Sequence, residues 1–271
     1  MLKFVCLLCL LTVAQTAHLQ QNWKLNWQIQ MDSTAIWDIS NLNQAFIYQN
    51  QNIQKLDING KMMLQESFKS IGIIEKIDAL NPLKIILFSE DQQTICYLDN
   101  ALALQGDCIN LSDQNINLAT SISSSSQTDR IWIYDEPNAR ITLITLRSNQ
   151  SQLVQNITGL LDLKTIVNIQ ETGNKLFVYD NSNQVAWFDI FGNFMDASSF
   201  SSKVIYPIED LFLVASNKEI YLVDLLDEEK KQLFFQGEGF LDGDIQKMKV
   251  VGSTLYIQTK SQFYCFQLEK V

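Results

Sequence analysis

Histidine is almost missing from this chain of 271 residues. The single one is His18. Catalysis of the Ser-His-Asp or Cys-His type depends on histidine, and so do most zinc sites in proteins. The sequence therefore excludes these chemistries in practice, and only a site built from carboxylates and amides stays open.

Proline and glycine are also scarce, with three and ten residues respectively. Disordered and low-complexity chains are usually rich in these residues. Hydrophobic residues make up 46% of the chain and aromatic residues 10%, which is enough for a sizeable core. The length exceeds that of most domains but suits one large all-β domain.

Long apolar runs are absent except at the N-terminus. Phe4 to Val13 is an apolar run of about ten residues that follows Lys3, too short to span a membrane and typical of an export signal. The small residues of Thr12-Val13-Ala14 favour cleavage before Gln15, or alternatively after Ala17. We therefore expect a signal peptide over residues 1–17, one domain over 18–271, and an exported protein without a transmembrane segment.

Basic residues are the minority charge, with 20 Lys and Arg against 30 Asp and Glu. Removal of the signal takes Lys3 away and leaves 19 against 30, a net charge of -11. Binding to phosphate backbones or anionic lipids needs a basic face. The composition argues against both partners, and the acidic excess is sufficiently explained by solubility.

Three cysteines remain after the signal is removed. Cys96 and Cys108 fall in two neighbouring predicted strands that a hairpin would bring face to face, and Cys265 lies in an alternating apolar strand. In an oxidising compartment the first two predict a disulfide. The alternative is three free, buried and inert thiols.

A repeated unit runs through the chain. Six segments share an apolar strand, a short polar turn and a second strand that often ends in Asp. Their corresponding positions, spaced by 36 to 46 residues, are Tyr48, Phe88, Tyr134, Tyr179, Ala215 and Gln258. That period is typical of four-stranded propeller blades. A shorter inner strand is expected before each hairpin, at 35–39, 73–77, 116–122, 165–169, 204–208 and 245–250.

The two ends of the chain complement each other. The sixth unit stops at Val271 after three strands, and Trp23 to Ile29 forms an unassigned strand before the first unit. Its alternation places Trp23, Leu25, Trp27 and Ile29 on one face. We predict an all-β, six-bladed β-propeller closed by this strand joining the last blade, because closure leaves no open sheet edge. A β-sandwich with a similar number of strands is the less favoured alternative.

Carboxylate and amide side chains in the expected inner strands provide one candidate site. They are Asp38, Glu75, Asp78 and Asn168. Some six-bladed propellers hydrolyse lactones with calcium held by such groups on the central axis. The positions of these residues within their strands do not correspond to one another, which weakens this hypothesis. Asp57 to Gly60 and Asp242 to Asp244 resemble calcium loops, but hairpin turns explain both.

Aromatic residues in expected loops provide the second candidate. Phe191, Phe194 and Phe200 follow the hairpin of the fourth unit, and Phe235 and Phe240 follow that of the fifth. Exposed, they would form a protein or sugar surface. The alternative is packing between blades.

Asp78 to Phe88 and Tyr97 to Leu102 resemble a signature of uncharacterised exported propeller proteins of Flavobacteria and other Bacteroidetes. Ile131 to Asp135 and Trp187 to Gly192 are similar to the same pattern. The resemblance implies a periplasmic or cell-surface, outer-membrane-associated protein without known catalytic residues.

Two functional hypotheses follow. The first is a non-enzymatic protein-binding propeller without a cofactor, serving as an accessory subunit of a cell-envelope assembly for outer-membrane biogenesis or secretion. The alternative is a calcium-dependent, lactonase-like hydrolase or a carbohydrate-binding propeller.

Overall fold

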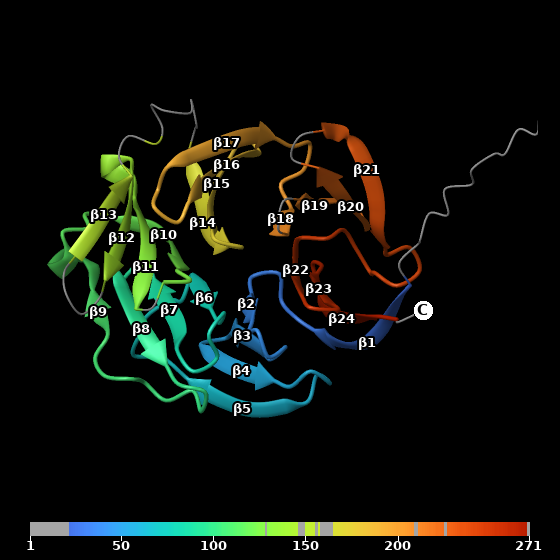
Figure 1. Cartoon of the computed structure of the whole chain (residues 1–271). Helices are drawn as coiled ribbons and strands as arrows, with labels where there is room; N and C mark the ends of the chain where they lie inside the picture. The colour runs from blue at the N-terminus through green and yellow to red at the C-terminus, as the bar shows by residue number, and fades with distance from the viewer. Residues whose placement is uncertain are drawn as a thin grey trace, which may run out of the picture.

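The computed structural model describes residues 22–127, 129–145, 150–154, 157, 165–208, 211–224 and 227–269. In this part of the chain, six four-stranded antiparallel sheets surround a central axis (Figure 1). The predicted six-bladed propeller is confirmed. The predicted signal peptide over residues 1–17 lies outside the described residues.

Each blade is an up-and-down meander, numbered here in chain order. Blade 1 contains β2 (Ile36–Ile39), β3 (Ala45–Gln49), β4 (Asn52–Leu56) and β5 (Met62–Ser67). Blade 2 contains β6 (Lys76–Asp78), β7 (Ile85–Ser89), β8 (Thr94–Leu98) and β9 (Ile109–Asn110). Blade 3 contains β10 (Ala119–Ser124), β11 (Arg130–Asp135), β12 (Arg140–Thr145) and β13 (Gln150–Val154).

Blade 4 contains β14 (Ile166–Thr172), β15 (Lys175–Asp180), β16 (Gln184–Asp189) and β17 (Phe194–Ser199). Blade 5 contains β18 (Ile205–Ile208), β19 (Leu211–Ser216), β20 (Glu219–Asp224) and β21 (Asp227–Gln236). Blade 6 contains β22 (Lys247–Val251), β23 (Thr254–Gln258), β24 (Gln262–Leu268) and the N-terminal β1 (Trp23–Gln30).

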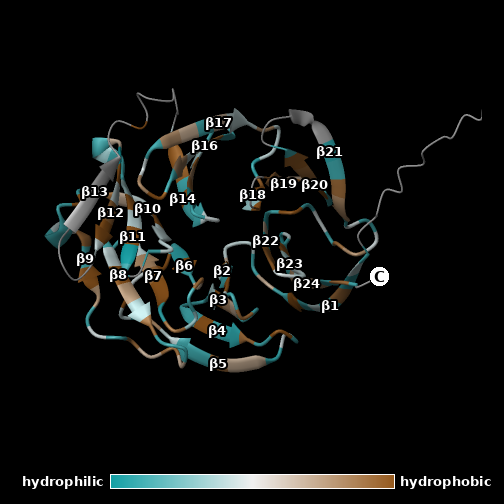
Figure 2. Ribbon diagram, in the orientation of Figure 1, coloured by the Kyte–Doolittle hydropathy of each residue, from teal (hydrophilic) through white to brown (hydrophobic). Residues whose placement is uncertain are grey.

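The middle strands of the blades are buried on both faces. All five residues of β7 and of β23 are buried. A blade packs against a neighbour on each side, so both faces of its middle strands become core, and a continuous apolar run replaces simple alternation. The hydrophobic segments in Figure 2 accordingly fall on strands such as β7, β12 and β19.

The Asp that ends the second strand of several repeats initiates a hairpin. In Asp57, Asp99 and Asp189, Oδ1 accepts the backbone N–H groups two and four residues later at 2.8–2.9 Å. This is the side-chain mimicry of a backbone turn that favours Asp at such positions. The third residue after each Asp has a positive φ, which Gly60 adopts readily. Asp57 to Gly60 is therefore a hairpin turn, as predicted.

The N-terminal strand completes the ring. β1 pairs antiparallel with β24, so the first and last described strands lie side by side (Figure 1). Its predicted single apolar face is wrong, because a bulge shifts the register between Leu25 and Trp27. Trp23 and Leu25 pack in the core shared with blade 5, whereas Trp27 and Ile29 pack in the core shared with blade 1. One extra residue in a strand reverses the side-chain phase.

Hydrogen bonds from the two indoles fasten this closure on both sides. Trp23 Nε1 donates to the carbonyl of Phe234 in blade 5, and Trp27 Nε1 donates to the carbonyl of Ile58 in blade 1, each at 2.8 Å. A Cβ atom on Gly60 would lie 2.6 Å from the Trp27 ring. The absence of a side chain at Gly60 thus permits both the hairpin turn and the close packing of Trp27, which belongs to the closing strand.

The inner strands begin one to three residues later than the sequence pattern indicates. The delay is largest in β6, which starts at Lys76 instead of residue 73, and in β10, which starts at Ala119 instead of residue 116. Ile74 and Ile116 are buried in the connections that lead into these blades. Their apolar character reflects core packing before the strand starts.

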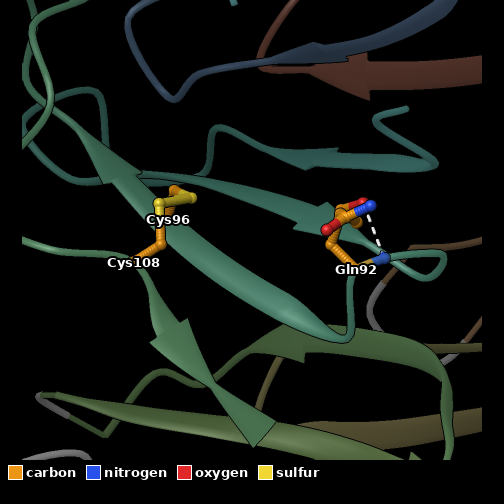
Figure 3. The surroundings of a disulfide bond; sticks show 4 residues. Gln92, Cys96 and Cys108 are labelled. Carbon is orange, nitrogen blue, oxygen red and sulfur yellow. Dashed lines mark hydrogen bonds between the residues drawn. A yellow bond between two sulfur atoms is a disulfide. The ribbon is translucent and has the colours of Figure 1, made fainter. Parts of the chain in front are cut away.

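Cys96 and Cys108 form a disulfide in blade 2 (Figure 3). Cys265 is free and fully buried in β24, where burial raises the pKa of its thiol to about 12. A thiol held in this state is unreactive at neutral pH. Within the described residues, no helix has the length and hydrophobicity needed to cross a membrane.

Candidate functional sites: the channel and two surfaces

The inner strands of all six blades surround a cavity of about 520 Å³ on the axis. Each repeated unit has one corresponding position, from Tyr48 in blade 1 to Gln258 in blade 6. In every blade, strand pairing places one residue of the inner strand or its start opposite this position. This first ring consists of Ile36, Lys76, Ser121, Asn168, Val204 and Lys247. The second ring lies two residues further along each strand and consists of Asp38, Asp78, Ser123, Gln170, Tyr206 and Lys249.

The two aspartates of the second ring occupy corresponding positions. Asp38 pairs with Phe46, and Asp78 pairs with Ile86. Phe46 and Ile86 each lie two residues before the corresponding position of their repeat. The sequence-based statement that these positions do not match is therefore wrong for this pair. Strand pairing shows this register directly, since Lys76 pairs with Phe88 as Ile36 pairs with Tyr48.

Asp38 links three blades. Its Oδ1 lies 2.6 Å from Lys249 Nζ of blade 6, and its Oδ2 accepts the backbone N–H of Ala79 in blade 2 at 2.8 Å. Burial alone would raise the pKa of Asp38, but the lysines beside it outweigh burial and lower it. Asp78 continues the chain of contacts, because it accepts both the N–H and the hydroxyl of Ser124 in blade 3 at 2.7 and 2.8 Å.

The lysines of the first ring donate mainly to backbone carbonyls. Lys76 Nζ donates to Asn168 Oδ1 and to the carbonyl of Ile169 at 2.9 Å, and also to the carbonyl of Ile122. Lys247 donates to the carbonyl of Trp37, and its ammonium lies 4.4 Å from the centre of that indole ring. Burial lowers the pKa of both lysines to about 8.

Glu171 joins blade 4 to blade 3. Its carboxylate accepts the N–H of Ser126 at 2.6 Å, the hydroxyl of Ser125 at 2.8 Å and the indole N–H of Trp132 at 2.6 Å. We call the connected set of Asp38, Asp78, Lys76, Lys247, Lys249 and Glu171 the polar belt. It runs through blades 6, 1, 2, 3 and 4.

The polar belt does not suit a calcium centre. Asp38 is paired with an ammonium, and Asp78 is engaged by Ser124. Four lysines line the same cavity and would repel a dication. Among the described residues, no group of three His, Cys, Asp or Glu side chains could hold a metal ion. The charged groups of the polar belt therefore bind the blades to one another, and the geometry does not support the lactonase-like alternative.

The seam between blades 4 and 5 is aromatic. Phe212 of blade 5 is fully buried, with its ring centre 5.6 Å from that of Phe177, 5.8 Å from Trp187 and 4.8 Å from Phe200. Phe200, predicted as part of a binding surface, is buried in this seam. For Phe200, the alternative considered from the sequence, packing between blades, is therefore confirmed.

A second cavity, of about 630 Å³, lies at the closing strand between β1 and β21. We call it the aromatic groove. Its apolar lining consists of Trp23, Leu25, Leu233, Phe234, Phe235 and Phe240. Phe240 is 50% exposed. Phe235 is buried at the base against Phe266, with ring centres 4.7 Å apart. The rings of Trp23 and Phe234 lie 5.3 Å apart.

The remaining two candidates lie elsewhere. Phe191 and Phe194 belong to the β16–β17 hairpin and outer strand of blade 4 and are 62% and 48% exposed. The structure thus divides the five phenylalanines among a seam, a groove and a blade edge. Trp23 and Phe234 were missed as groove residues. Trp23 was predicted only as part of the apolar face of the closing strand, and no sequence signal connects residues this far apart in the chain.

Comparisons with known proteins agree with the fold. No protein-family model matches the chain, and no curated protein matches its sequence. Its structure is similar to the Pan2 WD40 domain of Neurospora crassa, with a TM-score of 0.63, 10% identity, and coverage of 93% of this chain and 97% of that one.

It is also similar to an inactive virginiamycin B lyase variant from Staphylococcus aureus solved with quinupristin, with a TM-score of 0.61, 10% identity and coverage of 92% and 100%. Raptor from Chaetomium thermophilum matches with a TM-score of 0.55 and 9% identity over 90% of this chain and 24% of that one. At these identities the similarities establish the propeller architecture.

Proposed function

We propose that this chain is a non-enzymatic propeller that binds another protein through the aromatic groove. The observation that carries the proposal is the contrast between the two cavities. The charged groups of the polar belt in the channel are engaged with one another and with backbone groups. The groove instead exposes half of Phe240 beside Trp23 and Phe234. Aromatic anchors in a partly enclosed pocket are typical of protein interfaces.

The partner's contact region follows from the groove's chemistry. Among the described lining residues, Glu238 and Glu269 stand beside the aromatic side chains, and Lys24 is the one cation. The whole chain has a net charge of -10. An extended segment with an apolar side chain, flanked by basic residues, would complement both the apolar lining and the acidic surroundings.

The cellular setting is part of the proposal. We infer that the protein is exported and that its partner belongs to a cell-envelope assembly, in line with the resemblance to exported Bacteroidetes propellers. The export-signal pattern over residues 1–17 supports this setting. The Cys96–Cys108 disulfide supports it independently, because stable disulfides are typical of oxidising compartments.

Affinity purification with paired variants tests the proposal. The tagged native protein, Phe240→Ser and Phe191→Ser are each recovered from solubilised envelope, and the associated proteins are quantified by mass spectrometry. Phe191→Ser is the matched control, because it removes an exposed phenylalanine outside the groove. We expect a stoichiometric partner with the native protein and the control, and at least a roughly tenfold weaker complex with Phe240→Ser when purified components are titrated.

Two results would overturn the proposal. Recovery of the native protein alone under gentle detergent and salt would remove the protein partner. A partner lost by Phe191→Ser but kept by Phe240→Ser would place binding at the outer edge of blade 4.

A further inference from the structure

One sequence motif belongs neither to the aromatic groove nor to the polar belt. Asn110-Leu111-Ser112 matches Asn-x-Ser/Thr, the acceptor pattern for N-linked glycans in exported proteins, which is called a sequon. Two further sequons begin at Asn149 and Asn156, and both asparagines lie outside the described residues. Asn110 is therefore the sequon asparagine whose surroundings the structure describes.

Asn110 lies at the outer rim of the propeller. It ends β9, the outer strand of blade 2, and its side chain is exposed. Figure 1 shows β9 on the opposite side of the ring from β1 and β21, the strands beside the aromatic groove. A bulky group attached to Asn110 would therefore stand clear of the groove and of the central channel.

The amide of Asn110 is oriented by Ser112. Asn110 Oδ1 accepts the backbone N–H of Ser112 at 2.9 Å and the Ser112 hydroxyl at 2.7 Å. Both donors need an acceptor, so they identify the oxygen of the amide and leave its nitrogen on the other side. Within the described residues, Nδ2 of Asn110 donates no hydrogen bond. The exposed side chain thus offers its nitrogen to solvent.

The same contact caps the 3-10 helix η1 (Leu111–Gln114). Capping explains why residue 110 carries an acceptor oxygen, which Asp, Ser or Thr would also supply. It makes no use of Nδ2, and Nδ2 is the atom that glycosylation modifies. The cap and a glycan can therefore coexist on Asn110, and the folded chain would lose no described contact on modification.

We propose that Asn110 carries an N-linked glycan, added during export by an oligosaccharyltransferase. The donor is an oligosaccharide joined to a lipid through a diphosphate. The bond from C1 of its first sugar to the diphosphate oxygen breaks, and a bond from C1 to Nδ2 forms. One amide proton passes to a base of the transferase, and the lipid diphosphate leaves with the bonding electrons. The inference rests on the export included in the proposed function, and it does not depend on the aromatic groove.

The glycan would also protect the edge of blade 2. β9 is the edge strand of its sheet and has only two residues. An open edge can pair with a strand of another chain, and natural proteins commonly cover or shorten such edges. A hydrophilic glycan on the last residue of β9 would hinder that pairing.

Glycopeptide mapping of the protein purified from its own source cells tests the site. Electron-transfer fragmentation locates a glycan on a single asparagine, so the three sequons are measured separately. We expect a glycan on Asn110 in the native protein and its loss in Ser112→Ala, which removes the hydroxyl while Asn110 remains. Ser112→Thr restores the hydroxyl and should keep the glycan.

Asn117→Gln is the matched control, because Asn117 is also exposed but has Ala119 at the second following position. It should leave the glycan on Asn110 in place. The N-terminal peptide in the same map reports export, which we expect to give a first residue of Gln15 or His18. An exported protein with an unmodified Asn110, or a glycan retained in Ser112→Ala, would overturn the glycan alone. A chain that keeps residues 1–14 would overturn the export setting and the glycan together.

Discussion

In the described part of the chain, every seam between blades contains an apolar cluster, but the inner rims are joined in two different ways. From blade 6 through blades 1, 2, 3 and 4, the inner rim is joined by ion pairs and hydrogen bonds such as Asp38 to Lys249 and Glu171 to Ser126. Between blades 4 and 5, an aromatic cluster around Phe212 provides the described contacts. Directional polar contacts fix the relative position of blades, whereas apolar packing holds them together without a preferred register.

Asp38→Ala should have the largest effect, because Asp38 joins blades 6, 1 and 2 of the polar belt. Lys249 would be left as a buried ammonium without its carboxylate, and the free energy of unfolding should fall by about 3–5 kcal/mol. Urea denaturation monitored by tryptophan fluorescence measures the loss.

The control for this variant occupies the same ring on the side without the belt. Tyr206 lies at the position of Asp38, and its hydroxyl makes no hydrogen bond within the described residues. Tyr206→Phe should change the free energy of unfolding by less than about 0.5 kcal/mol. Equal losses in the two variants would contradict the division into two kinds of seam.

Phe212→Leu tests the aromatic seam and should have an intermediate effect. Leucine keeps an apolar side chain there but loses the ring contacts with Phe177, Trp187 and Phe200. We expect a loss of about 1–2 kcal/mol in the same assay. Phe194→Leu, at a 48% exposed position, should stay within about 0.5 kcal/mol. An unchanged Phe212→Leu protein would show that these ring contacts contribute little to stability.

The smallest effect is a pH dependence that arises in the belt. The pKa of Lys76 is about 8 in the folded chain against 10.5 ordinarily, because of burial. Above pH 8 the folded state therefore binds fewer protons at this site than the unfolded state, and the contribution of Lys76 to stability should rise by on the order of 1 kcal/mol from pH 7 to 9. Lys247, whose pKa is also about 8, contributes in the same direction.

Urea midpoints of the native protein and of Lys76→Met at pH 7, 8 and 9 measure this contribution. Met cannot titrate, so the variant should show a smaller rise. The window ends near pH 9, because there the unfolded chain begins to ionise the Cys265 thiol, whose folded pKa is about 12, and this opposes the gain from Lys76. Identical slopes in both proteins would exclude Lys76 as the source.

Prediction from sequence succeeded where the physics is local. The Asp-initiated hairpins, the apolar middle strands and the period of the repeat each depend on residues close together in the chain. It failed where the phase of a strand mattered. The bulge beside Trp27 moves side chains to the other face of the strand without changing the apolar count that the sequence displays.

The candidate sites were less predictable than the fold. Phe200 and Phe240 come from similar polar, loop-like stretches, yet one is buried in a seam and the other is half exposed beside the closing strand. Composition cannot distinguish them, because burial depends on which neighbouring blade approaches. The polar belt was equally hidden, since Lys76 and Asp38 pair with groups on other blades.

By itself, the sequence determined the class of fold, the number of blades and the scheme of closure, because strand periodicity and turn chemistry act over a few residues and are repeated six times. Only the tertiary structure decided which charges meet in the channel, which seam is aromatic and which cavities stay open. These outcomes depend on contacts between blades far apart in sequence, and those distances are set only when β1 closes the ring against β24.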